Sequence, residues 1–136
     1  MAIKITFLGA GSSVFVRNVL GDCIIHPELE DLTFALYDID AQRLEDSYLM
    51  LHAICAHYGK SVKMEKYVGV EELPQALTGA NFLICAIQVG GYDPCTISDF
   101  EIPKKYGLRQ TIADTLGVGG VFRALRTIPV MEMFGK

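Results

Sequence analysis

The sequence lacks the features of a membrane protein, a nucleic-acid-binding protein and a disulfide-stabilised protein. Its longest uninterrupted apolar run, residues 82–87, is far shorter than the ~20 residues that span a bilayer. Twelve Lys and Arg against sixteen Asp and Glu give a net charge of -4, which disfavours nucleic acid and anionic lipid as partners. The four cysteines form no CxxC pair, and no signal-peptide pattern opens the sequence. We therefore expect free thiols in a reducing, cytoplasmic environment.

What the sequence does contain is a regular alternation of apolar strands and amphipathic helices. Strands are predicted at residues 3–8, 32–37, 62–67 and 81–89. The third is polar enough for a sheet edge, whereas the fourth is apolar enough to be buried on both faces. Helical stripes are predicted between the first three strands, with a cap at Asp40 and a stop at Gly59 for the second helix. Further helices are expected at residues 71–77, 98–106 and 122–134, with an irregular segment at 109–120.

This order of strands and helices predicts an α/β fold, a doubly wound parallel sheet with helices on both faces. Nothing in the composition marks a domain boundary, so we expect residues 1–136 to form one domain. No strand follows the last predicted helix, although a doubly wound sheet would normally continue. We therefore expect the chain to be the N-terminal portion of a longer protein.

A glycine-containing turn joins the first predicted strand to the first predicted helix. Gly9 allows the tight turn there, and Gly11 lets the backbone approach a diphosphate at the helix N-terminus. Ser12 and Ser13 can add hydroxyl donors. Asp38, at the end of the second strand, is placed to bind the diol of an adenosine ribose and to repel a 2'-phosphate. This combination predicts a dinucleotide site that prefers NAD to NADP.

Two of these features have simpler alternatives. A lone GxG occurs in many strand-to-helix turns, and the third glycine of the usual fingerprint is replaced by Val14. Asp40 can serve as a second ribose ligand, although a helix cap is the favoured interpretation. His52 and His57 lie about 140° apart around their predicted helix. Because Cys55 between them belongs to the apolar stripe, we interpret all three as structural and predict no metal site in this chain.

The second half of the sequence carries longer and more specific motifs. They are Ala-Ile-Gln-Val-Gly-Gly-Tyr at 86–92, Lys-Lys-Tyr-Gly-Leu-Arg-Gln-Thr at 104–111, Asp-Thr-Leu-Gly-Val-Gly-Gly at 114–120 and Phe-Arg-Ala-Leu-Arg-Thr-Ile-Pro at 122–129. With residues 7–12 and 36–40, they resemble the N-terminal part of glycoside hydrolase family 4, over essentially the whole chain. The match is to the alpha-galactosidase-like branch, because the 6-phospho-glycosidase branch usually has Gln-Glu-Thr where this sequence has Ala-Asp-Thr at 113–115.

The resemblance implies a Rossmann-type domain from a glycosidase that depends on NAD and a divalent metal, typically Mn2+. Such an enzyme oxidises its sugar at C3, eliminates the leaving group, adds water and reduces C3 again. Residues matched to cofactor binding are Gly9, Gly11, Ser12, Asp38, Gln88 and Val89. Arg109 and Asp114 are matched to the sugar site. The family's catalytic and metal-binding residues lie beyond this stretch, so we assign no catalytic residue and expect the chain alone to be inactive.

The resemblance further suggests a homo-oligomer acting on a small-molecule glycoside. Two other functions stay open at this point. One is a non-catalytic dinucleotide-binding or assembly module, and the other is an ordinary NAD-dependent dehydrogenase domain.

Overall fold

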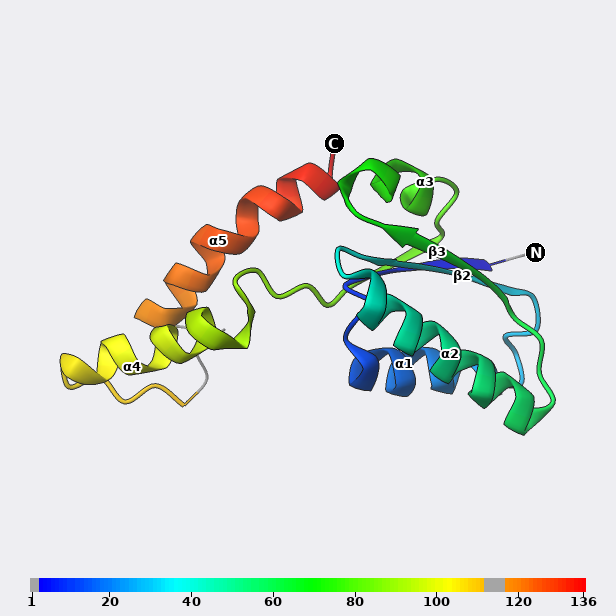
Figure 1. Cartoon of the computed structure of the whole chain (residues 1–136), viewed down its shortest axis with the longest axis horizontal. Coiled ribbons are helices and arrows are strands. Elements are labelled where there is room, and N and C mark those ends of the chain that lie inside the picture. Colours follow the sequence, from blue (N-terminus) through cyan, green and yellow to red (C-terminus); the bar gives the residue numbers. More distant parts are fainter. Residues whose placement is uncertain (1–2, 112–116) are drawn as a thin grey trace. The chain divides into compact units, whose positions relative to one another are not determined.

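A four-stranded parallel sheet forms the centre of the first of two units into which the chain divides (Figure 1). The computed structural model describes residues 3–111 and 117–136, and the two units are Met1–Ile87 and Gln88–Lys136. The strands are β1 (Ile3–Leu8), β2 (Leu32–Asp38), β3 (Lys63–Val68) and β4 (Phe82–Cys85), in the order β3-β2-β1-β4. All three pairs are parallel. The predicted α/β fold is thus confirmed, and the strand order reverses between β1 and β4.

The two long helices of this unit cover one face of the sheet. Figure 1 shows α1 (Ser13–Ile25) and α2 (Ala41–Tyr58) side by side on that face, and α3 (Leu73–Leu77) on the other. A short turn, η1 (Val70–Glu72), leads into α3. The main core lies between β1, β2 and the two long helices, and includes Phe7, Val16, Leu20, Ile24, Phe34, Leu36, Leu44 and Leu51. The predicted apolar stripe of α1 is therefore confirmed, although Val19 at its margin is 37% exposed.

The ends of α2 are fixed by the residues that the sequence predicts. The Asp40 carboxylate accepts hydrogen bonds from the backbone N–H groups of Gln42 and Arg43, at 3.0 and 3.1 Å. At the other end Gly59 takes the left-handed conformation, with φ +62°, and its N–H caps the last turn. A left-handed residue that ends a helix is most easily a glycine, because it has no Cβ to collide with the backbone. Both helix boundaries are thus set by local chemistry.

The fourth strand differs from its prediction. We expected residues 81–89 to be buried on both faces, but β4 ends at Cys85, and Phe82 and Leu83 are 60% and 50% exposed. The reason is topological. Among the described residues β4 is an edge strand that pairs with β1 alone, and the apolar core lies over β1 and β2, so most side chains of β4 are not covered. The prediction that the more polar β3 lies at an edge is confirmed.

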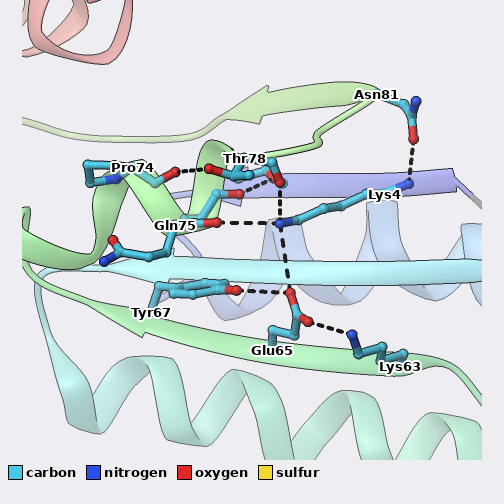
Figure 2. A network of polar contacts seen from close by, with 10 residues as sticks. Lys4, Lys63, Glu65, Tyr67, Pro74, Gln75, Thr78 and Asn81 are labelled. Carbon is cyan, nitrogen blue, oxygen red and sulfur yellow. Dashed lines mark hydrogen bonds and ion pairs between the residues drawn. The ribbon is translucent and has the colours of Figure 1, made fainter.

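A polar network holds α3 to the other face of the sheet (Figure 2). Lys4 of β1 donates from Nζ to the carbonyl oxygen of Thr78 at 2.7 Å, and lies 3.8 Å from the Glu65 carboxylate of β3. Glu65 also accepts from the Tyr67 hydroxyl at 2.9 Å and pairs with Lys63 at 2.7 Å. The polarity of β3 therefore reflects this network in part, because Lys63, Glu65 and Tyr67 all belong to it.

In residues 88–111 and 117–136, the described part of the second unit, there are three helical segments, and a buried ion pair joins two of them. They are a wide turn η2 (Gly91–Thr96), then α4 (Ile97–Lys105) and α5 (Val118–Phe134). Asp99 of α4 is only 2% exposed, and its carboxylate binds both terminal nitrogens of the Arg126 guanidinium. The pKa of Arg126 is raised, mainly by this hydrogen bonding. A planar guanidinium that binds both carboxylate oxygens fixes the relative rotation of the two helices.

The boundaries of these helices only partly follow the prediction. The helix expected at residues 98–106 is confirmed as α4 within one residue at each end. The prediction of an irregular segment at 109–120 is wrong for its last three residues, because α5 begins at Val118. The helix runs continuously through Pro129. No helix in the described parts of the chain has both the length and the apolar character needed to cross a bilayer.

The network around Glu65 predicts an acid-dependent loss of stability. Hydrogen bonding from Lys63, followed by that from Tyr67, lowers the pKa of Glu65, so the ionised carboxylate stabilises the fold above the ordinary glutamate pKa. This contribution is lost as pH falls through the lowered pKa. In urea titrations, Glu65→Gln is expected to reduce the free energy of unfolding at pH 7 by about 0.5–1 kcal/mol and to flatten its decline in acid. Glu30→Gln, at an exposed position, is the control. An equal acid dependence in wild type and Glu65→Gln would contradict the assignment.

Candidate dinucleotide-binding site

The turn after β1 is built around Gly9, whose φ of +86° is strained for any residue with a side chain. A Cβ at this position would also lie 2.7 Å from the carbonyl oxygen of Ala86, just beyond β4. The backbone N–H groups of Gly9 and Ala10 both donate to the carbonyl oxygen of Tyr37, at 2.9 Å each. The turn therefore packs against the carboxyl ends of two neighbouring strands, at the point where the strand order reverses.

Gly11 is held by the acidic residue at the end of β2. Its N–H donates to Asp38 Oδ2 at 2.6 Å, and a Cβ at Gly11 would lie 2.8 Å from the same oxygen and 2.9 Å from Cβ of Arg43. Packing within the protein therefore accounts for a glycine at position 11, because the loop lies close to the junction of β2 and α2. The predicted second role of Gly11, to let the backbone approach a diphosphate, stays a prediction.

The first turn of α1 follows this loop directly. Ser12 occupies the position before the helix and its side chain makes no capping hydrogen bond to it. Ser13 is exposed at the first helical position. The opening N–H groups of an α-helix have no partner inside the helix, and the positive end of the helix dipole lies there. The loop therefore presents an N-terminus whose capping hydroxyl is not used by the helix, which is an arrangement suited to an anion.

Asp38 retains hydrogen-bonding capacity beyond its two backbone contacts. Oδ2 accepts from Gly11 and Oδ1 accepts from the N–H of Asp40 at 3.0 Å. Each carboxylate oxygen can accept two hydrogen bonds, so one position remains on each oxygen, which matches a vicinal diol. Burial, followed by the charge of Asp38, raises the pKa of the neighbouring Tyr37. The alternative role of Asp40 as a ribose ligand is not needed, because its carboxylate caps α2.

The remaining predicted site residues belong to the second unit or lie outside the described residues. Gln88 is exposed and donates from Nε2 to Thr96 Oγ1 at 2.7 Å, while Val89 is half-buried. The sequence predicted that both residues end the fourth strand. In the structure they lie after it, because β4 ends at Cys85. Arg109 is exposed. Asp114 lies outside the described residues. The structure thus brings together Gly9, Gly11, Ser12, Ser13 and Asp38, all within the first unit.

Histidine, cysteine, aspartate and glutamate side chains form no group of three that could hold a metal ion in the described part of the chain. The ring of His52 packs edge-on against Tyr48 at 4.4 Å, and that of His57 against Tyr58 at 4.8 Å. Burial raises the pKa of the Cys55 thiol. These surroundings agree with the structural interpretation of all three residues.

Two charged residues that are prominent in the structure, Arg43 and Asp99, were not predicted from the sequence as functional or paired residues. The Cβ of Arg43 lies close to Gly11. The sequence offers one indication of this position, because Arg43 lies in the first turn of the helix that follows Asp38 and Asp40. Asp99 is the partner of Arg126, which the sequence alone left without a defined acid. That pairing spans 27 residues, and no local pattern in the sequence indicates it.

A comparison with known protein families finds a match to this sequence. The model described as "Family 4 glycosyl hydrolase" covers residues 4–134, nearly the whole chain. This chain belongs to family 4 of the glycosyl hydrolases. The resemblance seen in the sequence motifs is thereby confirmed.

Individual family 4 relatives indicate which part of a longer protein this chain matches. An alpha-galactosidase of Bacillus subtilis is 57% identical over 133 residues, covering 98% of this chain and 30% of its own length. An alpha-galacturonidase of Thermoanaerobacter italicus is 34% identical, covering 98% and 28%. The structure of a 6-phospho-beta glucosidase from Thermotoga maritima with manganese, NAD+ and glucose-6-phosphate superposes with a TM-score of 0.79 at 26% identity, covering 98% and 30%. The chain spans about 30% of the length of these relatives.

Crowding at Gly9 predicts a large loss of stability on adding one methyl group. Gly9→Ala places a Cβ against the backbone of Ala86 as well as straining φ, and is expected to cost roughly 3 kcal/mol or more in the free energy of unfolding. Gly59→Ala is the matched control, since φ is also positive there but nothing lies within 4 Å of the added atom. It is expected to cost about 1–2 kcal/mol. Equal losses for the two variants in urea unfolding would show that packing against Ala86 is unimportant.

Proposed function

We propose that this chain is the NAD-binding N-terminal part of a family 4 enzyme that hydrolyses alpha-galactosides. The observation that carries the proposal is the hydrogen bond from Gly11 to Asp38, which joins the glycine loop and the candidate ribose acid beside the reversal of strand order between β1 and β4. Open α/β sheets bind nucleotides at this point. The Thermotoga maritima relative, whose structure contains NAD+, supports the same cofactor.

The residues of the loop divide the work of cofactor binding. Gly9 and Gly11 keep the backbone close to the strand ends, so the N-terminus of α1 faces the diphosphate without an intervening side chain. Ser12 and Ser13 offer hydroxyl donors to the same group. Asp38 binds the ribose diol with the free acceptor position on each of its oxygens, and its negative charge disfavours a 2'-phosphate. NAD is therefore the proposed cofactor in preference to NADP.

Two further residues are proposed to contact the cofactor from the segment after β4. Gln88 uses its amide nitrogen on Thr96, which leaves the amide oxygen as an acceptor. Val89 adds an apolar contact. In the sugar site we propose Arg109 for the substrate hydroxyls and Asp114 as an acidic lining residue, both on the strength of the family motifs that contain them.

The proposed reaction begins with oxidation of the sugar at C3, which acidifies the proton at C2 and permits elimination of the glycosidic oxygen from C1. Water then adds, and C3 is reduced again. When bound, the nicotinamide supplies the hydride acceptor for the first step and the donor for the last. This chain's residues bind and orient that cofactor. We assign no residue here as the base that removes the C2 proton.

Manganese is proposed for the complete enzyme, as in the Thermotoga maritima structure. The described residues of this chain do not fit such a centre, because no three potential ligands converge among them. We therefore derive no step of the reaction from metal ligation by this chain.

An alpha-galactoside is the proposed substrate because the 57% identical relative is an alpha-galactosidase. A galacturonide is the second candidate, on the identity of 34% to an alpha-galacturonidase. Four free cysteines support the proposed cytoplasmic location, since reducing compartments maintain thiols. A homo-oligomer is also proposed, with the exposed apolar residues of β4 as the supporting feature.

The assignment of Asp38 predicts a change in cofactor preference. Asp38→Arg removes the diol ligand and adds a charge that attracts a 2'-phosphate, so NAD affinity is expected to fall by roughly tenfold or more and the preference for NAD over NADP to shrink. Asp38→Asn, which keeps an acceptor for Gly11 but no charge, should shift the preference less. Calorimetric titration of both nucleotides checks this. Unchanged affinities in folded Asp38→Arg protein would remove the ribose assignment.

The proposed reaction is tested in a chimera that joins residues 1–136 to the rest of the Bacillus subtilis alpha-galactosidase. Hydrolysis of an aryl alpha-galactoside is expected to require NAD and Mn2+ and to slow when the substrate carries deuterium at C3. An aryl alpha-galacturonide is the competing substrate. Hydrolysis that depends on neither NAD nor metal would overturn the redox mechanism, and NAD binding without hydrolysis would favour a non-catalytic module.

A further inference from the structure

We propose that Arg43 is a second determinant of cofactor choice, with its guanidinium lying on the adenine ring and offsetting the repulsion between Asp38 and a 2'-phosphate. This inference rests on the proposed NAD-binding function and assigns a part of that site to a residue outside the glycine loop. It makes cofactor preference the outcome of two opposite charges rather than of one acid.

The placement of Arg43 is fixed by the same contacts that build the loop. A Cβ built on Gly11 would lie 2.9 Å from Cβ of Arg43 and 2.8 Å from Oδ2 of Asp38. The base of the Arg43 side chain therefore stands at the loop, next to the candidate ribose acid. Asp40 caps the first turn of α2 through the N–H groups of Gln42 and Arg43, which holds the backbone of Arg43 in place.

The side chain of Arg43 has no structural task that accounts for its charge. It is exposed, and within residues 3–111 and 117–136 it makes no ion pair or side-chain hydrogen bond that would engage the guanidinium. Two lysines of the first unit differ in this respect, because Lys4 pairs with Glu65 and Lys66 pairs with Glu45. Arg43 is thus a cation positioned by its backbone with its planar end available.

Guanidinium chemistry matches the adenosine half of a dinucleotide. A planar, weakly hydrated cation stacks on aromatic faces, and adenine attached to a ribose held by Asp38 would lie within a side-chain length of the loop. Next to Asp38 lies Ile39, which is 77% exposed and offers an apolar surface at the same strand end. The positive charge of Arg43 would also attract the 2'-phosphate that Asp38 repels, so the two residues act in opposite directions on NADP.

The test compares Arg43→Ala and Arg43→Lys by calorimetric titration with NAD, NADP, AMP and nicotinamide mononucleotide. Arg43→Ala is expected to weaken NAD and AMP by a similar factor, roughly three- to thirtyfold, and to weaken NADP by a larger factor. Arg43→Lys keeps the charge but not the plane, so AMP should weaken while the ratio of NAD to NADP affinity stays near that of wild type. Nicotinamide mononucleotide should bind equally to all variants.

Lys60→Ala is the matched control, because it removes one positive charge from an exposed position at the opposite end of α2. It should leave all four affinities unchanged. If the wild-type chain binds NAD and Arg43→Ala binds NAD, NADP and AMP with unchanged affinities, the role of Arg43 is overturned. The proposed function would still stand in that case. Absence of NAD binding by the folded wild-type chain would overturn the proposed function and this inference with it.

Discussion

The candidate site depends on one hydrogen bond, from the N–H of Gly11 to the Asp38 carboxylate at 2.6 Å. It joins the loop that leaves β1 to the end of β2, two segments that parallel pairing already places side by side. Glycine at position 11 leaves room for this bond, because a Cβ there would lie 2.8 Å from the carboxylate oxygen and 2.9 Å from Cβ of Arg43. The bond also orients the carboxylate, leaving one acceptor position on each oxygen. The loop proposed for the diphosphate and the acid proposed for the ribose are thereby joined directly.

Each acidic residue near this loop has a separate task, and the separation follows from the backbone. Asp38 is the last residue of β2 and binds the loop, whereas Asp40 lies just before α2 and caps that helix. Because Asp40 fixes the first turn of α2, it also fixes where the side chain of Arg43 starts. The sheet beneath supports this arrangement from both faces, through the apolar core under α1 and α2 and through the Lys4 network under α3.

Local sequence features predicted correctly those strands and helix ends that residues close in the sequence determine. Predictions failed for features that depend on residues far apart in the sequence. The first strand, the Asp40 cap and the Gly59 stop follow from periodicity and capping preference, which act within a few residues. The predicted burial of β4 was wrong because an apolar run does not reveal which elements cover the two faces of the strand. The sequence also placed Gly11 and Asp38 at the correct ends of their strands, but their direct contact required the parallel register of β1 and β2.

The motifs that identify the family have a different physical role from the residues proposed to bind the cofactor. In the second unit, Gly119 and Gly120 are buried, and a Cβ at Gly119 would collide with the backbone carbonyl of Asp99. The side chain of Gln110 accepts from the N–H of Gly119 at 3.0 Å, and Arg126 binds Asp99. Residues of three recognisable motifs thus serve the packing of α4 against α5. The weak GxG pattern, by contrast, lies in the first unit and forms the loop. The specific motifs thus contain packing residues of the second unit, whereas the proposed cofactor site rests on two glycines and one acid that many folds could supply.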